Sequence, residues 1–130
     1  MKFGYVIVYV SSVTEALDFY RTAFGFETRF VHDSGQYGEL ETGATVLAFA
    51  SHAMGESNLG GQYQKADPHA APLGVELAFV TDDVAAAYGR AIAAGATPIK
   101  GPIEKPWGQI VAYVRAKDGS LIELCSPIGD

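Results

Sequence analysis

The hydrophobic pattern of the chain repeats once. Residues 5–13 form an apolar run of β-branched and aromatic side chains that ends in two serines and a valine. Residues 76–84 repeat this order, with two aspartates in place of the serines. In each half a segment of spaced alanine and aromatic residues follows and closes on a glycine, Gly25 or Gly95. Each half therefore predicts a β-strand followed by a helix.

A second pair of similar stretches supports a duplication. Residues 43–49 and residues 119–125 both begin with glycine and continue as apolar runs of strand length. The two pairs occur in the same order and at nearly the same spacing. Together they indicate an internal repeat, so we expect two halves of similar structure.

The first half predicts the element order β-α-β-β-β. Alternating side chains favour a strand over residues 3–10. Ser12 and Glu15 have the spacing of a capping box, so we expect a helix that begins here and ends at Gly25. Further strands are expected at about residues 26–33, 36–42 and 44–50.

The second half predicts the same order. A strand is expected over about residues 73–81, and Asp82 or Asp83 is expected to cap a helix that runs to about residue 94. A short strand at 97–100 carries Pro98 and is followed by two more prolines, which confines it to a sheet edge or an irregular crossing. The last two strands are expected at residues 109–116 and 120–126.

The longest stretch without periodicity is residues 51–72. A stretch of this length in a compact domain is either a linker or a functional flap. Its place between the two copies favours a linker, although Met54, Leu59 and Tyr63 are able to close over a cleft. We expect one domain over residues 1–130, with module one at about 1–52, a linker at about 53–72 and module two at about 73–130.

Composition narrows the choice of partners. Hydrophobic residues make up 48% of the chain, with seven Tyr and seven Phe, which is ample material for a packed interior. The net charge is −6 and no basic stripe exists, so binding to a nucleic-acid backbone is not expected. A negative surface leaves neutral or cationic small molecules as the easier partners.

The chain also carries no signal for export or for a membrane. Cys125 is the single cysteine, so an intramolecular disulfide framework is excluded. The first residues lack the apolar core and cleavage site of a signal peptide, and no apolar run approaches the ~20 residues of a membrane helix. We expect a cytoplasmic protein that does not bind membranes.

Short motifs in both halves follow one known pattern. They are Val10-Ser11-Ser12, Ala16-Leu17-Asp18-Phe19-Tyr20, Phe24-Gly25-Phe26, Ala78-Phe79, Asp83-Val84, Ala94-Gly95-Ala96, Pro106-Trp107-Gly108 and Asp118-Gly119-Ser120-Leu121-Ile122-Glu123-Leu124. The chain thereby resembles the glyoxalase/bleomycin resistance/dioxygenase (vicinal oxygen chelate) superfamily. The resemblance implies an α+β fold of two β-α-β-β-β modules whose strands curl into a cleft, often completed in a homodimer.

The resemblance also implies four metal-ligand positions, which fall at Tyr5, Leu47, Glu76 and Glu123. The internal repeat matches Tyr5 with Glu76, and Leu47 with Glu123. Metal-dependent relatives use histidine and carboxylate ligands here, whereas this chain has lost both histidines and one carboxylate. Such a donor set suits Zn, Ni or Fe poorly. We therefore expect no cofactor, with a divalent ion such as Mg or Mn on the two glutamates as the alternative.

Glu123 and Glu76 are the main candidates for chemistry. Two carboxylates across a cleft push one pKa upward and can then serve as acid and base. The structural alternative is that Glu123 is hydrogen-bonded to Tyr5 or water, and that Glu76 is simply solvated.

Four further residues are candidates for ligand contacts. Trp107 can stack on a ligand ring, but a core or dimer-interface role suits it equally. Phe49 and Tyr113 fit the core better than a pocket. His52 directly follows a strand and can reach the mouth of the cleft, although a solvated position is expected for it and for the other two histidines.

Two functions follow from these observations. The first is a metal-independent protein of the bleomycin-resistance type, which sequesters a small organic ligand in the aromatic and acidic cleft of a homodimer. The alternative is a lyase, isomerase or dioxygenase-like enzyme that uses a divalent metal held by Glu76 and Glu123. The sequence does not decide between a binding protein and an enzyme, and it does not identify the ligand.

Overall fold

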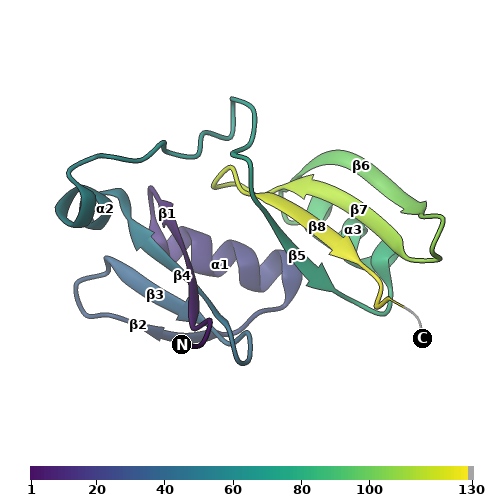
Figure 1. Ribbon diagram of the computed structural model, residues 1–130, viewed down its shortest axis with the longest axis horizontal. Helices are drawn as coiled ribbons and strands as arrows, with labels where there is room; N and C mark the ends of the chain where they lie inside the picture. Colours follow the sequence, from purple (N-terminus) through teal and green to yellow (C-terminus); the bar gives the residue numbers. More distant parts are fainter. Residues whose placement is uncertain (129–130) are drawn as a thin grey trace. The chain divides into compact units, whose positions relative to one another are not determined.

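The repeated sequence pattern produces a repeated fold. The structure is a computed structural model that describes residues 1–128, and the chain divides into two units, the second of which begins at Asp67 (Figure 1). Each unit contains one four-stranded sheet with the element order β-α-β-β-β, which confirms the predicted α+β class. None of the helices described in residues 1–128 has the length and apolarity needed to cross a bilayer.

The first unit is built on a mixed sheet with strand order β1-β4-β3-β2. Strand β1 runs parallel to β4, and the other neighbours are antiparallel. Its elements are β1 (Tyr5–Val10), α1 (Val13–Phe24), β2 (Thr28–Val31), β3 (Tyr37–Leu40), β4 (Val46–Ser51) and the additional helix α2 (His52–Leu59).

The second unit has the same topology, with strand order β5-β8-β7-β6 and a parallel β5–β8 pair. Its elements are β5 (Glu76–Val80), α3 (Val84–Ala93), β6 (Thr97–Glu104), β7 (Ile110–Arg115) and β8 (Leu121–Cys125). Strand β6 is longer than the sequence predicted and lies at the sheet edge, as its prolines require.

The core of the first unit lies between α1 and one face of its sheet. The hydroxyl of Ser12 caps α1 by accepting a hydrogen bond from the Glu15 backbone N–H, and Gly25 ends the helix in a left-handed conformation with φ of 81°. Tyr20 of α1 is fully buried against Phe49 of β4, with ring centroids 4.8 Å apart. The predicted capping and the predicted core role of Phe49 are both confirmed.

Strand register determines which side chains face the helix and which face the opposite side of the sheet. In a parallel pair, directly paired residues lie on the same face, and successive residues alternate between faces. Phe49 packs on α1, so Leu47, two residues earlier, also faces the helix and is buried. Glu123 is paired with Ala78, whereas its neighbour Ile122 is fully buried on the helix side.

The same register corrects the repeat alignment made from the sequence. Tyr5 is paired with Val46 in the first sheet, and Glu76 is paired with Leu121 in the second. Counting from these pairs, the counterpart of Glu123 is Ala48, which is paired with Ile7. A shift of one residue moves a strand side chain to the opposite face.

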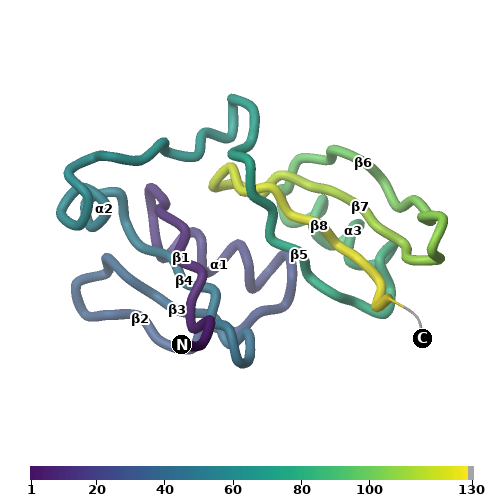
Figure 2. Tube along the Cα trace, in the orientation of Figure 1, coloured from purple at the N-terminus to yellow at the C-terminus, as the bar shows by residue number. Residues whose placement is uncertain are grey.

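The segment between the repeats also differs from its prediction. Residues 52–59 form helix α2, where no regular structure was expected. The remainder of the segment, residues 60–75, connects α2 to β5 and contains neither helix nor strand (Figure 2).

Candidate functional site

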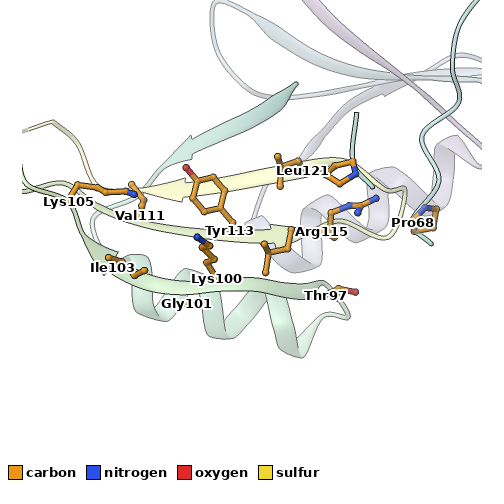
Figure 3. A pocket seen from close by; sticks show the side chains of 12 residues that line it. Pro68, Thr97, Lys100, Gly101, Ile103, Lys105, Val111, Tyr113, Arg115 and Leu121 are labelled. Carbon is orange, nitrogen blue, oxygen red and sulfur yellow. The ribbon is translucent and has the colours of Figure 1, made fainter. Parts of the chain in front are cut away.

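The face of the second sheet that turns away from α3 carries a hollow of about 720 Å³. Strands β6, β7 and β8 form its floor, and Pro68 and Pro72 of the preceding segment border one end (Figure 3). Its walls are mainly aliphatic, with Ile99, Ile103 and Leu121 among them. The hollow lies entirely within the second unit.

Side chains that alternate between the two faces of β7 and β8 determine which residues line this hollow. Val111, Tyr113 and Arg115 are alternate residues of β7, so they point to one face of the sheet. Tyr113 is directly paired with Glu123, and Arg115 with Leu121, so β8 adds its own alternate residues to that face. The intervening residues, such as Ala112 and Val114, are fully buried on the helix side.

Tyr113 and Glu123 form the polar centre of the face. The Tyr113 hydroxyl donates a hydrogen bond of 2.8 Å to Oε1 of Glu123. This bond, together with burial and the neighbouring negative charge, raises the pKa of Tyr113 to about 12. Burial raises the pKa of Glu123, but the hydrogen bonds from Tyr113 and Glu76 outweigh it and leave that pKa below its ordinary value.

Glu76 lies at the start of β5 and interacts with Glu123. Burial raises the pKa of Glu76, and so do its hydrogen bond to Glu123 and the charge there. The two shifts have opposite directions because Glu123 also accepts the Tyr113 hydrogen bond, which stabilises its charged form. The structure thus brings the two sequence candidates together.

Cys125 closes this side of the site. Its side chain is 4% exposed, and the thiol lies 3.8 Å from the Phe79 carbonyl oxygen. Burial, together with the nearby carboxylates, raises the pKa of the Cys125 thiol. The residue is therefore a protonated, buried packing group.

Arg115, which the sequence analysis did not select, holds the chain segment beside the hollow. Its guanidinium donates hydrogen bonds to three backbone carbonyls, at 3.0 Å to Gly119, 2.9 Å to Ala70 and 3.1 Å to Asp67. These bonds tie the segment before β5 to β7 and use the guanidinium for structure. Backbone carbonyl oxygens are present in every residue, so the sequence does not show that they would surround this arginine.

Lys100 and Lys105, which line the β6 side, were also missed. Alternation in β6 is interrupted by register shifts on both sides of Lys100. As a result the consecutive residues Ile99, Lys100 and Gly101 all border the hollow. A bulge of this kind re-aims a side chain, and a period-two pattern cannot reveal it.

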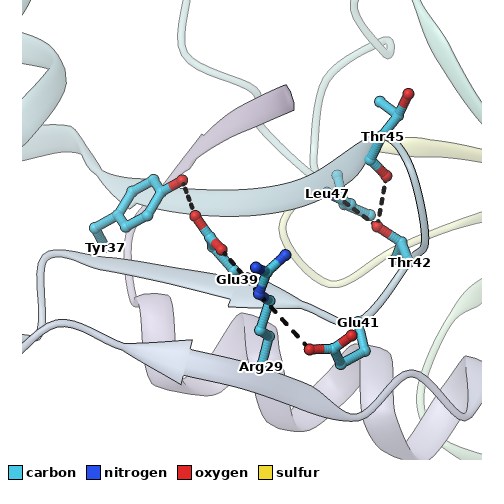
Figure 4. A network of polar contacts seen from close by, with 7 residues as sticks. All are labelled: Arg29, Tyr37, Glu39, Glu41, Thr42, Thr45 and Leu47. Atoms are coloured by element: carbon cyan, nitrogen blue, oxygen red, sulfur yellow. Dashed lines mark hydrogen bonds and ion pairs between the residues drawn. The ribbon is translucent and has the colours of Figure 1, made fainter. Parts of the chain in front are cut away.

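The corresponding face of the first sheet carries a different polar network (Figure 4). The Tyr37 hydroxyl donates a hydrogen bond of 2.8 Å to Oε2 of Glu39. The Arg29 guanidinium lies 3.7 Å from Glu39 and 3.7 Å from Glu41. Burial and the Glu39 hydrogen bond raise the pKa of Tyr37 above its usual range. The network lies on β2, β3 and the residue after β3, and none of its members was a sequence candidate.

Tyr5 and Leu47, the candidates of the first unit, lie on opposite faces of the sheet. Tyr5 is 57% exposed and belongs to the face without α1. Leu47 is packed on the helix side, and its backbone N–H donates to the Thr42 hydroxyl at 2.9 Å (Figure 4). That hydroxyl donates in turn to the Thr45 carbonyl, so these bonds stabilise the β3–β4 turn. Phe49, fully buried, has no surface to offer a ligand.

His52 lies in an aromatic stack at the start of α2. Its Nδ1 is 2.8 Å from the Tyr63 hydroxyl, and the two rings stack with centroids 6.0 Å apart. Tyr63 also packs on Tyr9, at 4.8 Å. Burial, followed by the charge of Lys65, lowers the pKa of His52. His52 is thus a packed residue, contrary to the expected solvated position.

Trp107 lies at the tip of the β6–β7 hairpin and does not line the hollow. Its side chain is 61% exposed, and the indole Nε1 donates a hydrogen bond of 2.9 Å to the Gln109 side chain. Within its own unit it belongs to neither the core nor the pocket.

The side chains at the implied metal site offer few donor atoms. Within residues 1–128, no three His, Cys, Asp or Glu side chains are placed so that they can hold a metal ion. Glu76 and Glu123 supply two carboxylates, while Leu47 supplies no donor and faces α1. Transition-metal sites need three or four nitrogen, oxygen or sulfur ligands. The residues described do not fit such a centre.

Comparison with known proteins gives one match by sequence. The model of the Glyoxalase/Bleomycin resistance protein/Dioxygenase superfamily matches residues 2–124. A comparison with curated protein sequences gives no match.

Solved structures match nearly the whole chain. A glyoxalase-related enzyme from Fulvimarina pelagi has a TM-score of 0.82 at 19% identity, covering 97% of this chain and 88% of its own. A glyoxalase/bleomycin resistance protein/dioxygenase family enzyme from Burkholderia phytofirmans PsJN has a TM-score of 0.82 at 23% sequence identity, and the match covers 97% of this chain and 98% of that enzyme. A protein of unknown function from Agrobacterium tumefaciens str. C58 has a TM-score of 0.77 at 27% sequence identity, and the match covers 97% of this chain and 94% of that protein. The first two likenesses support the fold and nothing finer.

Proposed function

Because the chain belongs to the glyoxalase/bleomycin resistance protein/dioxygenase superfamily, we propose that it binds and sequesters a small organic molecule without a metal ion. The observation that carries the proposal is the hollow of about 720 Å³ on the open face of the second sheet. Its volume lies within the range of about 300–1,000 Å³ typical of small-molecule sites.

The lining of the hollow suits an organic ligand. Ile99, Ile103, Val111 and Leu121 present aliphatic surface, and covering that surface with a ligand removes it from water. Tyr113 adds one aromatic ring whose hydroxyl is already bonded to Glu123. The ring can therefore contact a ligand without leaving a polar group unsatisfied.

The carboxyl pair lies outside the lining of the hollow and acts through Tyr113, which belongs to the lining. Glu123, whose pKa is lowered, accepts the hydrogen bond from the Tyr113 hydroxyl and so fixes the position of the phenol ring. Glu76 interacts with Glu123 and has a raised pKa. Neither carboxyl is required to contact the ligand, and ligand binding requires no metal.

Fluorescence of N-phenylnaphthylamine, a neutral aromatic probe, tests the proposal in the full chain. We expect the probe to bind in buffer that contains EDTA, and Leu121→Trp to weaken binding at least about tenfold by filling the hollow. Trp107→Ala is the matched control, because this exposed aromatic lies outside the hollow, and it should leave the affinity unchanged.

Two results would contradict the proposal. One is binding that Leu121→Trp does not weaken, which would place the probe elsewhere. The other is binding that disappears with EDTA and returns with one equivalent of a divalent ion per chain, which would favour a metal-dependent protein.

A further inference from the structure

The charge of the hollow is opposite to the charge of the chain. The chain carries a net charge of −6 and only nine lysine and arginine residues. Three of the nine, Lys100, Lys105 and Arg115, line this hollow, and none of its lining residues is acidic. The overall charge favours neutral or cationic partners, but a bound ligand experiences the nearest groups most strongly.

Only two of these cations are available to a ligand. Arg115 already donates to three backbone carbonyls. In the described part of the chain, neither the Lys100 nor the Lys105 ammonium makes a hydrogen bond or an ion pair. Lys105 acts on Glu123 only through its charge, which contributes to the lowered pKa of that carboxyl.

The backbone fixes where both lysines begin. Lys100 is paired with Tyr113 of β7, between two register shifts that bring its side chain to the hollow. Lys105 follows β6 directly and is half-buried. Its backbone N–H donates to Gln109 at 2.8 Å, and its carbonyl accepts from Gly108 at 2.8 Å. Figure 3 shows the Lys100 side chain beside Tyr113 and the Lys105 side chain beside Val111.

We propose that Lys100 and Lys105 bind an anionic group of the ligand, while Tyr113 and the aliphatic wall contact its apolar body. This inference rests on the proposed function, since it names the ligand class of the same hollow: a small organic anion such as a carboxylate, sulfonate or phosphate. A lysine ammonium is a compact charge with three donors, so it binds all three groups and selects charge more than shape. Two lysines are too few for a nucleic-acid backbone.

A matched pair of probes tests the inference. Anilinonaphthalene sulfonate is N-phenylnaphthylamine with one added sulfonate, so the ratio of their affinities isolates the contribution of the anion. In the full chain at low salt we expect the sulfonate to bind about tenfold tighter, and added salt to reduce that ratio. The double variant Lys100→Met/Lys105→Met should bring the ratio near one, and the neutral probe should still bind.

The controls separate this site from general charge. Lys2→Met/Lys65→Met changes the net charge by the same amount at lysines outside the hollow, and it should keep the ratio. Lys100→Arg/Lys105→Arg keeps the charge and should keep most of the preference. Carboxylate and phosphate analogues of the probe then show which anion is preferred.

The outcomes distinguish this inference from the proposed function. If both probes bind and Leu121→Trp weakens them, but the ratio survives Lys100→Met/Lys105→Met, the anion site is wrong and the hollow remains the binding site. If Leu121→Trp weakens neither probe, both proposals fail. If Lys2→Met/Lys65→Met lowers the ratio equally, the preference comes from overall charge and the anion site is again overturned.

Discussion

Glu76 and Glu123 lie on neighbouring strands, and their pKa values are shifted in opposite directions. Glu123 accepts a hydrogen bond from Tyr113 and has a lowered pKa, whereas the pKa of Glu76 is raised by burial and by Glu123. A lowered carboxyl pKa contributes stability above the unfolded value of about 4.3, and this is lost as the pH falls through the folded pKa. A raised carboxyl pKa has the opposite effect, so Glu76 costs stability as the pH rises through its folded pKa.

Glu76→Gln should therefore stabilise the protein at neutral pH. The amide keeps a hydrogen-bond donor toward Glu123 but has no charge to place beside it. We expect the urea midpoint of the variant to exceed that of the parent at pH 7, with a smaller difference at pH 4, where Glu76 is mostly protonated in both states. Glu56→Gln, at a carboxyl in the other unit, is the control. An equal or lower midpoint for Glu76→Gln at pH 7 would contradict the raised pKa of Glu76.

Among the helices and strands, hydrophobic periodicity predicted the amphipathic elements. It failed for elements that lack an amphipathic pattern or have it interrupted. Helices α1 and α3 were predictable from their caps and apolar stripes. Helix α2 has no apolar stripe, although Ser51 caps its start and Gly60, in a left-handed conformation, follows its end. Ser51 and Gly60 were the sequence features that could have indicated this helix.

Strands β4 and β6 show two further limits of prediction from sequence. All six residues of β4 are buried, so neither face can be recognised from its composition, and Leu47 was matched with Glu123 in place of Ala48. The bulges around Lys100 in β6 similarly concealed the cationic side of the hollow. Glu76 and Glu123 were selected because the family resemblance places metal-ligand positions there, and the strand register puts both on one face of the second sheet.

The packing of α1 on β3 gives a prediction for one glycine. A Cβ at Gly38 would lie 2.7 Å from Leu17 Cδ1 and 3.2 Å from Val13 Cγ1, so the helix approaches the strand closely only because this residue lacks a side chain. Gly38→Ala should lower the free energy of unfolding by about 1–3 kcal/mol through overpacking. The measurement is urea denaturation followed by circular dichroism.

Gly4→Ala is the matched control for that experiment. A Cβ at Gly4 meets nothing within 4 Å, and its backbone is not left-handed. The variant should stay within about 0.5 kcal/mol of the parent. Equal stability for both alanine variants would show that α1 and β3 are not in tight contact.

At the scale of the whole molecule, each unit leaves apolar side chains uncovered at its parallel edge strand. Tyr5 and Ile7 of β1 are exposed, as are Val75 and Val80 at β5. Exposed apolar residues along strand edges favour association with another surface. Together with the family membership, these exposed side chains lead us to propose that the chain forms a homodimer through these strands.

Sedimentation velocity tests the proposed dimer. We expect a dimer at micromolar concentration, and we expect Ile7→Glu/Val80→Glu to shift the chain toward monomer, because charged groups at an apolar interface must be desolvated. Lys2→Glu, outside these strands, should leave the association unchanged. A parent chain that remains monomeric at about 100 µM would rule out the dimer.

Binding in the hollow without a metal is tested most directly by an NMR titration of the isotope-labelled full chain with N-phenylnaphthylamine in the presence of EDTA. We expect saturable shifts of the backbone signals around Ile103, Val111, Tyr113 and Leu121, with smaller changes in the signals of Arg29, Tyr37 and Glu39 in the first unit. Shifts confined to other residues, or shifts seen only after a divalent metal is restored, would contradict it.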